Sequence, residues 1–376
     1  MNILLIPDKF KGSLSAMEAI NALSKGIHKN SKNHKVKYIL ASDGGDGFLA
    51  AIEKAKPDLK IIKTDVVDAV GNSLKSFYLF EENSKTAFIE LAQTSGLSML
   101  NPKDRDCKYT STYGTGLQIK DAVEKGSLKI FIGLGGSATN DGGTGIARAL
   151  GVQFLDKDDN NIKTNGSNLG KIDRIILSDS IIKNTEIIAV NDVINPLLGK
   201  TGATYTYALQ KGAGKKELPV LERGMKNLFD IISQNGSEFT DTPGFGAAGG
   251  TSFGLFAFTN AKIILGIDFI LKINDFNNIL EDSKIDLIIT GEGKIDDQTF
   301  HGKFIKGIGD RAKKYNIPVI AICGINDLQN YTTEDLGLKQ IHTIKTENMS
   351  IKESMDNAGE LIEDLVSRIE LNGYLY

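Results

Sequence analysis

The sequence predicts an α/β protein: a doubly wound parallel-sheet domain built from both ends of the chain, with a second α/β domain inserted between them. Three observations predict this organisation. Short apolar runs of strand length alternate with amphipathic helical stretches at both ends of the chain. The middle of the chain instead begins with a pair of runs typical of an antiparallel hairpin. Glycine supplies 40 of the 376 residues, against about 26 at average usage, and clusters just after apolar runs.

The N-terminal part of the chain alternates between strand and helix patterns. Asn2–Pro7 is an apolar run of the kind that is buried on both faces of a parallel sheet. A helix is expected from about Ser15, because Ser15 and Glu18 have capping-box spacing and an apolar stripe at helical spacing follows. The alternation then predicts a strand at Val36–Ala41, a helix at Phe48–Lys56 and a strand at Leu59–Val67.

The middle of the chain has a different pattern. Two runs, Leu74–Phe80 and Thr86–Leu91, are joined by a short polar connection and predict an antiparallel hairpin. The C-terminal part returns to the alternation, with strands expected at Asp286–Thr290, Pro318–Cys323 and Lys339–Ile344 and helices near Phe304–Tyr315 and Ile351–Leu371.

These patterns predict two domains. The first is discontinuous, residues 1–68 and 283–376, and the inserted α/β domain comprises residues 69–282. Ligands are expected at the carboxyl ends of the parallel strands, in a cleft that faces the insert. The two connections between the domains can act as a pair of hinges, and closure would exclude water from the reacting groups.

Composition excludes several classes of protein. The net charge of −3, with neutral histidines, gives no electrostatic footprint for nucleic acid or for an anionic membrane. No apolar stretch approaches the ~20 residues of a membrane span, and the N-terminus lacks a signal-peptide pattern. Cys107 and Cys323 are too few for a disulfide framework or a zinc site. We therefore expect a cytoplasmic protein with no nucleic-acid or membrane partner, and the oligomeric state stays open.

Two aspartates follow the second predicted strand, in Ser42-Asp43-Gly44-Gly45-Asp46-Gly47. Carboxylates spaced by glycines suit Mg²⁺, which takes one or two carboxylates together with phosphate oxygens and water. A solvated Asp/Gly turn is the alternative, but it leaves the acidic residues at other strand ends unexplained. We interpret Asp43 and Asp46 as metal ligands or as the group that accepts a hydroxyl proton.

Charged residues also follow the first predicted strand and the strand that ends at Thr290. If these strands are neighbours in one sheet, their carboxylates and lysines converge. Phosphoryl transfer requires such a cluster, because metal and ammonium groups neutralise the transferring group and a carboxylate can accept the attacking hydroxyl's proton. The predicted catalytic residues are Asp8, Lys9, Lys11, Asp43, Asp46 and Lys294. The predicted metal ligands are Asp43, Asp46 and Glu292.

A glycine-rich segment follows the predicted strand Ile130–Leu134. Its consecutive backbone N–H groups, ahead of a helix through Ile146–Leu150, could cradle phosphates. The expected nucleotide- or phosphate-binding residues are Gly133, Gly135, Gly136, Ser137, Asn140, Asp141, Gly142 and Gly143. The segment also meets a relaxed dinucleotide fingerprint, but Gly142 and Gly143 would then fall in the first turns of the binding helix, so a dehydrogenase is the weaker interpretation.

Other signals are individually weak. A guanidinium such as that of Arg105 can grip a carboxylate through two hydrogen bonds, although a surface arginine is about as probable from spacing alone. Gly199-Lys200-Thr201 ends like a P-loop, but the glycine that should begin the motif is absent. The expected substrate-binding residues are Ser13, Arg105, Thr112, Asp192 and Lys211.

Taken in order, these motifs resemble those of the bacterial glycerate kinase family (type 1) over nearly the whole chain. The resemblance rests on Asp8–Ser13, Ser42–Gly47, Thr110–Gly116, Gly133–Gly143, Asp192–Leu197, Gln210–Ala213, Pro243–Gly250 and Gly291–Asp296 with Gln298 and Thr299. It implies ATP-dependent phosphorylation of D-glycerate, with 2-phosphoglycerate favoured as the product, Mg²⁺ as cofactor, and a flavodoxin-like domain carrying an inserted α/β domain. A non-catalytic sensor of glycerate or nucleotide, with the same fold, is the alternative.

The sequence departs from the family pattern at three positions. Asn191 replaces the cysteine that usually precedes Asp192. Cys107 stands where a proline usually follows the family's Arg-Asn pair, and Ile305 replaces a proline after Gly302-Lys303. Shape rather than charge is the expected requirement at these positions, so they bear on loop geometry more than on activity.

Overall fold

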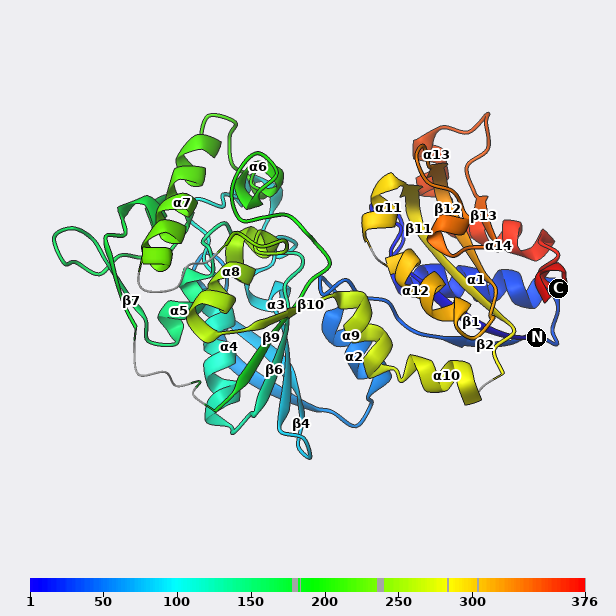
Figure 1. The fold of residues 1–376 in the computed structure, drawn as a ribbon, viewed down its shortest axis with the longest axis horizontal. Helices are drawn as coiled ribbons and strands as arrows, with labels where there is room; N and C mark the ends of the chain where they lie inside the picture. The colour runs from blue at the N-terminus through cyan, green and yellow to red at the C-terminus, as the bar shows by residue number, and fades with distance from the viewer. Residues whose placement is uncertain (178–181, 183, 235–239, 283, 303, 376) are drawn as a thin grey trace. The chain divides into compact units, whose positions relative to one another are not determined.

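The computed structural model describes residues 1–177, 182, 184–234, 240–282, 284–302 and 304–375, and the chain forms two compact units (Figure 1). The first unit comprises Met1–Ser42 and Ile267–Tyr376, and the second comprises Asp43–Gly266. Both junctions lie earlier in the chain than the 68/69 and 282/283 boundaries expected from the sequence. The reason at the first junction is that β3 (Lys60–Val67) pairs with a strand of the second unit.

The first unit contains a five-stranded parallel sheet in the order β13-β12-β11-β1-β2. Its strands are β1 (Asn2–Pro7), β2 (Lys35–Tyr38), β11 (Leu287–Asp296), β12 (Val319–Asp327) and β13 (Gln340–Thr343). Renumbered within the unit and starting from β2, the order is 2-1-3-4-5, which is the flavodoxin-like order. In such sheets ligands bind where the strand order reverses, here at the carboxyl ends of β1 and β11.

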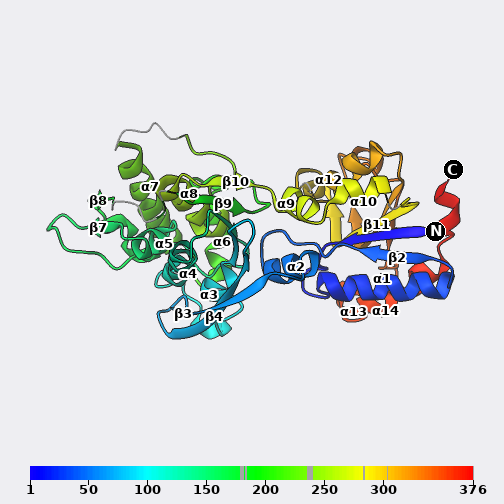
Figure 2. The same ribbon diagram turned by 90° about the horizontal axis from the view of Figure 1, so that it is seen from below.

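Helices cover both faces of this sheet (Figure 2). On one face, α1 and α14 pack against alternate apolar side chains of β1, β11 and β12, among them Ile3, Leu5 and Ile289. The helices of the unit are α1 (Ala16–Asn30), α9 (Gly266–Ile273), α10 (Phe276–Asp282), α11 (Asp297–Gly302), α12 (Phe304–Lys313), α13 (Ile351–Asp356) and α14 (Ala358–Arg368). The capping box predicted at Ser15 and Glu18 is confirmed.

The end of the chain differs from its sequence pattern. The pattern predicts one helix over Ile351–Leu371, whereas the structure has α13 and α14. The two helices meet at Asn357, which is both the C-cap of α13 and the residue before α14. Its backbone, at φ −111° and ψ 14°, is not helical. An asparagine favours such a break, because its amide can hydrogen-bond nearby backbone groups.

The second unit contains a six-stranded sheet in the order β10-β9-β6-β5-β4-β3. The pairs β3–β4 and β4–β5 are antiparallel and the others are parallel, so the predicted hairpin is confirmed. The remaining strands are β4 (Ser73–Glu81), β5 (Thr86–Glu90), β6 (Lys129–Gly133), β9 (Glu186–Val190), β10 (Lys262–Ile264) and the separate pair β7 (Gln153–Leu155) and β8 (Arg174–Ile176). The helices are α2 (Phe48–Ala55), α3 (Ala92–Ser95), α4 (Tyr113–Glu124), α5 (Thr144–Ala149), α6 (Ala203–Tyr207), α7 (Leu218–Gln234) and α8 (Ala247–Thr259).

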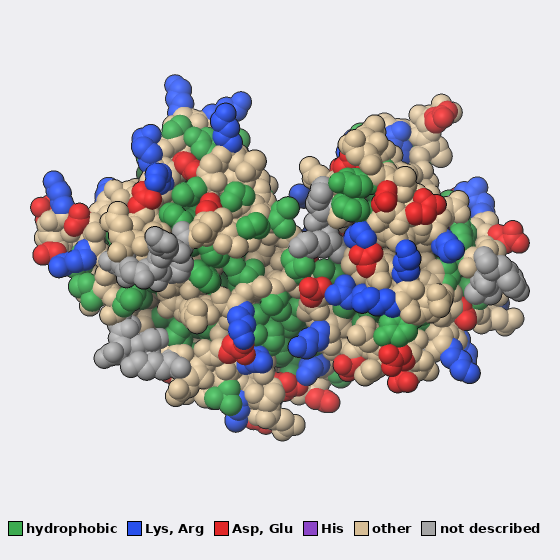
Figure 3. Space-filling view, viewed as in Figure 1, with side chains coloured by type: hydrophobic (Ala, Val, Ile, Leu, Met, Phe, Trp, Pro, Cys, Tyr) green, Lys and Arg blue, Asp and Glu red, His purple; other side chains and the backbone are tan. Residues whose placement is uncertain are grey.

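The predicted α/β class with mainly parallel sheets is confirmed. On the face drawn in Figure 3, acidic and basic side chains are interspersed. None of the helices in the described part of the chain has both the length and the apolar character that crossing a bilayer needs.

Candidate active site

Two carboxylates lie at the reversal point of the first unit's sheet. Asp8 directly follows β1, and its N–H donates to the carbonyl oxygen of Gly291 on β11 (2.8 Å). Glu292 is the next residue of β11, is partly buried, and accepts a hydrogen bond from Thr299 Oγ1 (2.8 Å). Burial, helped by the carboxylates of Asp8 and Asp296, raises the pKa of Glu292 to about 7. This carboxyl can therefore gain or lose a proton near neutral pH.

The strands β11 and β12 continue beyond the point where β1 ends. Their pairing runs on to Asp296 opposite Asp327. Lys294 lies on this extension with 48% of its side chain exposed, and its ammonium pairs with Asp296 (3.1 Å) and Asp327 (2.8 Å). The predicted catalytic lysine thus already has two carboxylate partners, and a substrate phosphate would have to compete with them.

The other residues predicted in the first unit lie in the turn after β1. The backbone N–H of Lys9 donates to Asp8 Oδ1 (2.7 Å), and Lys11 is exposed. The hydroxyl of Ser13 donates to the carbonyl oxygen of Met355, so it ties this turn to α13. The structure therefore brings Asp8 and Glu292 together in the first unit, whereas Asp43 and Asp46 belong to the second unit.

Two glycine-rich segments of the second unit pack backbone against backbone. They are Asp43–Gly47, which precedes α2, and Gly133–Gly136, which begins at the last residue of β6. The N–H of Gly135 donates to the carbonyl oxygen of Gly44 (2.9 Å). A Cβ added at Gly135 would lie 2.3 Å from the Cα of Gly45, so only glycine permits this approach. These glycines serve the contact between the two segments.

The contact holds both aspartates at the carboxyl end of β6. Asp43 Oδ1 accepts a hydrogen bond from the N–H of Gly45 (2.9 Å). The carboxylate of Asp46 lies over Gly136, where an added Cβ would be 2.6 Å from Asp46 Oδ1. Asp46 is exposed and Asp43 is partly buried, so both carboxylates have access to solvent or ligand.

We expect Gly135→Ala to displace this contact and to lower turnover several-fold. The added methyl would overlap the backbone of Gly45. Overpacking of this kind should lower the free energy of unfolding by about 1–3 kcal/mol. The Tm and the initial rate of the reaction should both be lower than in the wild type. Gly170→Ala is the matched control, because its added Cβ would lie 3.6 Å from the Cα of Gly224. Equal stability and turnover for Gly135→Ala and Gly170→Ala would contradict the close packing.

A glutamate that sequence reasoning missed supports the same loop. Glu90, at the end of β5, is buried and accepts hydrogen bonds from the N–H groups of Gly47 (3.2 Å) and Leu49 (2.9 Å). It thereby caps α2, whose own N-cap residue has no side-chain oxygen. Burial, with a contribution from Asp46, raises the pKa of Glu90. The available signal was a single acid in the otherwise apolar run Thr86–Leu91.

Asp141 occupies the place that the sequence assigned to a phosphate. Its fully buried carboxylate accepts hydrogen bonds from the N–H and hydroxyl of Thr112 (2.8 and 2.9 Å) and from the N–H groups of Gly143 (3.1 Å) and Gly145 (3.3 Å). The N–H groups around the start of α5 therefore have a protein partner instead of a ligand. Asp141 acts as an internal anchor between α4 and α5, and Thr112 is part of that anchor.

The segment before Asp141 keeps unused hydrogen-bonding capacity. Asn140 donates through Nδ2 to Thr204 Oγ1 (3.3 Å). The side-chain oxygens of Thr139 and Asn140 are buried and have no hydrogen-bond partner within the described residues. Lys211 reaches the segment from η3 (Leu209–Lys211) and donates to Ser137 Oγ (2.7 Å) and the carbonyl oxygen of Thr139 (2.8 Å). Buried polar atoms are mostly paired in native proteins, so this segment is suited to receive a ligand.

The remaining predicted substrate-binding residues are separated. Asp192 follows β9 and accepts a hydrogen bond from the N–H of Gly266 (2.8 Å). A Cβ added at Gly266 would lie 2.8 Å from both Asp192 Oδ2 and the carbonyl carbon of Asp43, so these two aspartates flank one glycine. Arg105 donates through Nε to the carbonyl oxygen of Leu100 (3.3 Å). The structure thus groups Asp192, but not Arg105, with Asp43.

The carboxylates fit Mg²⁺ only as part of a shared shell. Among the described residues, no group of three or more His, Cys, Asp or Glu side chains is arranged to hold a metal ion. The predicted set of Asp43, Asp46 and Glu292 draws on both units and stays a prediction. Mg²⁺ usually takes one or two carboxylates and completes its shell with phosphate oxygens and water. Asp43 and Asp46 suit that mode of binding.

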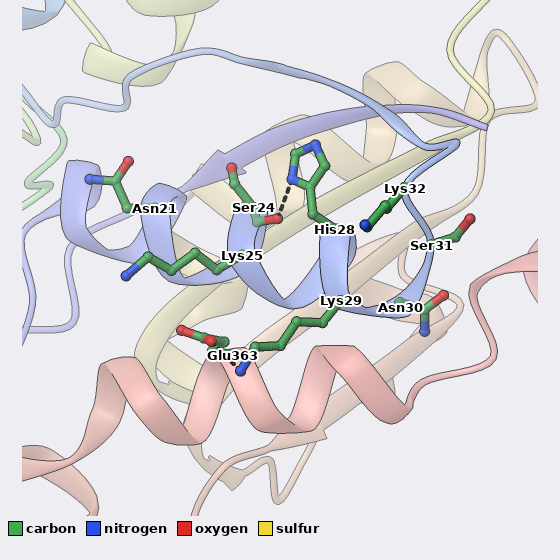
Figure 4. Close-up of a pocket in the computed structure, with 9 residues that line it drawn as sticks. All are labelled: Asn21, Ser24, Lys25, His28, Lys29, Asn30, Ser31, Lys32 and Glu363. Carbon is green, nitrogen blue, oxygen red and sulfur yellow. Dashed lines mark hydrogen bonds and ion pairs between the residues drawn. The ribbon is translucent and has the colours of Figure 1, made fainter.

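The first unit also has a surface hollow away from these residues. A hollow of about 760 Å³ lies over the C-terminal half of α1 and is lined mainly by lysine and other polar side chains (Figure 4). Lys29 in its wall pairs with Glu363. The N–H of Lys35, which follows α1 by a short connection, donates to the carbonyl oxygen of Met1. The helix α1 therefore ends near the amino end of β1, whereas Asp8 lies at the carboxyl end of that strand. The hollow is therefore not part of the candidate site.

All three departures from the family pattern are buried. Asn191 is 4% exposed, and Cys107 and Ile305 are 0% exposed. Burial raises the pKa of the Cys107 thiol to about 11, so it stays neutral at neutral pH. Burial agrees with a requirement of shape at Cys107 and Ile305. Both side-chain polar atoms of Asn191 are buried without a hydrogen-bond partner within the described residues, so the expectation stays a prediction there.

Comparisons with known proteins cover the whole chain. The family described as the glycerate kinase family matches residues 3–371. A glycerate kinase of Halalkalibacterium halodurans is 36% identical over 98% of this chain and 97% of its own length. A glycerate 2-kinase of Escherichia coli is 35% identical over 92% of this chain and 89% of its own. A crystal structure of a candidate glycerate kinase 2 from Salmonella typhimurium LT2 has a TM-score of 0.79 and 33% identity, and covers 99% of this chain and 98% of its own.

Proposed function

This chain belongs to the glycerate kinase family and is a kinase, and we propose that it transfers the terminal phosphoryl group of ATP to the 2-hydroxyl of D-glycerate with Mg²⁺ as cofactor. The observation that carries the proposal beyond the family is the pair Asp8 and Glu292 at the reversal point of a flavodoxin-like sheet. The glycerate 2-kinase of Escherichia coli among the relatives favours the 2-hydroxyl as the acceptor.

Phosphoryl transfer forms one bond to phosphorus and breaks another. The hydroxyl oxygen of glycerate bonds to the terminal phosphorus of ATP, the bond from that phosphorus to the ADP oxygen breaks, and the hydroxyl proton passes to a carboxylate. Glu292 suits that last role, because a general base works best with a pKa near the working pH. We therefore propose that Glu292 accepts the hydroxyl proton and that Asp43 and Asp46 would hold Mg²⁺.

Other residues bind and orient the substrates in this proposal. Mg²⁺ would neutralise charge on the phosphates. Lys9 and Lys11 would bind the carboxylate of glycerate or the transferred phosphoryl group. The expectation that both units enclose one pair of substrates stays a prediction, and small-angle scattering with and without both ligands would measure it.

The assay is direct. Purified protein with ATP, Mg²⁺ and D-glycerate should release ADP, and phosphorus NMR should identify 2-phosphoglycerate. L-glycerate and a metal chelator serve as controls. Binding of ATP and glycerate without ADP release above background would instead favour a sensor. An absorbance change at the nicotinamide band with a dinucleotide would favour a dehydrogenase.

A further inference from the structure

Lys211 is a buried ammonium whose partners are neutral. Its side chain belongs to a residue only 4% exposed, and its two hydrogen bonds go to the hydroxyl of Ser137 and the carbonyl oxygen of Thr139. None of the ion pairs seen in the described part of the chain involves Lys211. Burying a charge without a paired opposite charge is unfavourable, so the charged form of this lysine destabilises the folded state.

The groups around Lys211 do not remove that cost. Burial lowers the pKa of Lys211 to about 8, and the smaller electrostatic influences of Cys107 and Asp141 act in the opposite direction. The Cys107 thiol is neutral at pH 7, since its own pKa is raised to about 11. Burial also raises the pKa of Asp141, which disfavours its charged form and weakens it as a partner for the Lys211 ammonium. The positive charge at Lys211 is thus only partly compensated.

The segment that Lys211 holds is incomplete in a complementary way. Thr139 Oγ1 and Asn140 Oδ1 are buried without hydrogen-bond partners within the described residues. The same segment runs from Ser137, whose hydroxyl Lys211 contacts, to Asn140. The Thr139 hydroxyl can donate to an oxyanion, whereas the Asn140 oxygen can only accept. An under-compensated cation beside an unpaired hydroxyl donor therefore suits this segment to an oxyanion.

We propose that Lys211 is a positioning residue that holds the Ser137–Asn140 segment, by its two hydrogen bonds and its charge, for binding a substrate oxyanion. The oxyanion is a phosphate of ATP or the carboxylate of glycerate. The inference rests on the proposed function, because that function supplies both anions. Lys211 acts through Ser137 and Thr139 rather than by contact with the reacting atoms.

The test compares Lys211→Met with Lys215→Met. Methionine keeps the length and apolar stem of lysine but removes the charge, and Lys215 is an exposed lysine four residues away. Dissociation constants for ATP and for glycerate are measured separately by calorimetry, with kcat and KM alongside. Lys211→Met should weaken binding of one of the two ligands by about tenfold or more, since a hydrogen bond to a charged group is at stake. Lys215→Met should bind both normally, and the ligand affected identifies the oxyanion.

A purely structural role predicts another pattern. In that case Lys211→Met lowers Tm, while the folded fraction binds both ligands as the wild type does, and this outcome overturns the proposal. So does normal binding at unchanged Tm. Because binding is measured without turnover, absence of glycerate phosphorylation by the wild type would refute the proposed function alone.

The wild type supplies a second measurement that needs no variant. If the charge of Lys211 matters, Kd for the affected ligand should rise as the pH passes about 8, where Lys211 loses its proton. The stability of the folded protein should increase over the same pH range. The unfolded chain binds more protons than the folded one between pH 8 and the ordinary lysine pKa, so this group makes the fold more stable as pH rises there. A Kd for both ligands that stays constant from pH 7 to 9.5 overturns the proposal.

Discussion

Replacing Asp43 or Asp46 with Asn should lower turnover at low Mg²⁺, because the lost carboxylate would weaken the binding of the metal. If the carboxylate instead accepts the hydroxyl proton, the loss should be about 10²–10⁴-fold. Asparagine keeps the shape, and its amide oxygen can still accept the Gly45 N–H that Asp43 accepts. Only the anion is removed. Any loss of rate can therefore be attributed to charge.

Magnesium titration of each variant separates the two roles of these aspartates. A lost metal ligand should raise the Mg²⁺ concentration needed, and activity should return at high metal. A lost proton acceptor should leave a rate that added Mg²⁺ does not restore. Asp158→Asn, at an exposed turn of the same unit, is the control. Turnover within a few-fold of wild type for both variants at low Mg²⁺ would show that Asp43 and Asp46 lie in a solvated turn without catalytic function.

Replacing Glu292 with Gln should lower kcat by at least about 10²-fold above pH 7. The wild-type rate should rise with pH through about 7, because the carboxyl must be ionised to accept a proton. The Gln variant should lose that inflection. If Glu292 is instead a metal ligand, high Mg²⁺ should restore much of the variant's rate.

The Glu292→Gln variant should be more stable than the wild type at high pH, where it is less active. The folded-state pKa of Glu292 lies above its ordinary value of 4.5. The folded state therefore binds more protons than the unfolded state between about pH 4.5 and 7, and stability from this group is lost as pH rises through that window. The Gln variant should thus have a higher Tm than the wild type above pH 7, and the difference in Tm should shrink towards pH 4.5.

Thr299→Val provides a matched test of the environment of Glu292. The Thr299 hydroxyl donates to Glu292 and lowers the pKa of its carboxyl, against the larger effect of burial. Removing the hydroxyl should raise that pKa further and move the inflection in the rate to higher pH. An unchanged pH profile in this variant would mean that another group controls the rate.

The comparison of sequence and structure separates local from non-local information. Strand and helix patterns at both chain ends, the hairpin at β4 and β5, and the capping box at Ser15 could all be predicted, since each depends on neighbours in sequence. The pairing of β3 could not be predicted. Its residues have the pattern of a strand, but nothing in that pattern says that the partner is β4 of the second sheet.

The glycine-rich motifs show the same limit at the site. Glycine at Gly135 indicates that something approaches the backbone closely, and the sequence suggests a phosphate. The structure places Gly45 there. Likewise, an acid in a glycine-rich loop suggests a ligand site, whereas the carboxylate of Asp141 is buried against the protein's own N–H groups. The partner of a glycine or a carboxylate is a property of the fold.

By itself the sequence determined the α/β class, the resemblance to a kinase family and the residue types available for phosphoryl transfer, because periodicity and motif order are carried by adjacent residues. Only the tertiary structure decided that Asp8 meets Glu292, that Glu90 supports the Asp46 loop and that Lys211 is buried. These facts depend on strand pairing between distant segments and on the exclusion of water, and the second of these is what moves the pKa values of Glu292 and Lys211. Proximity and burial arise only when the chain folds.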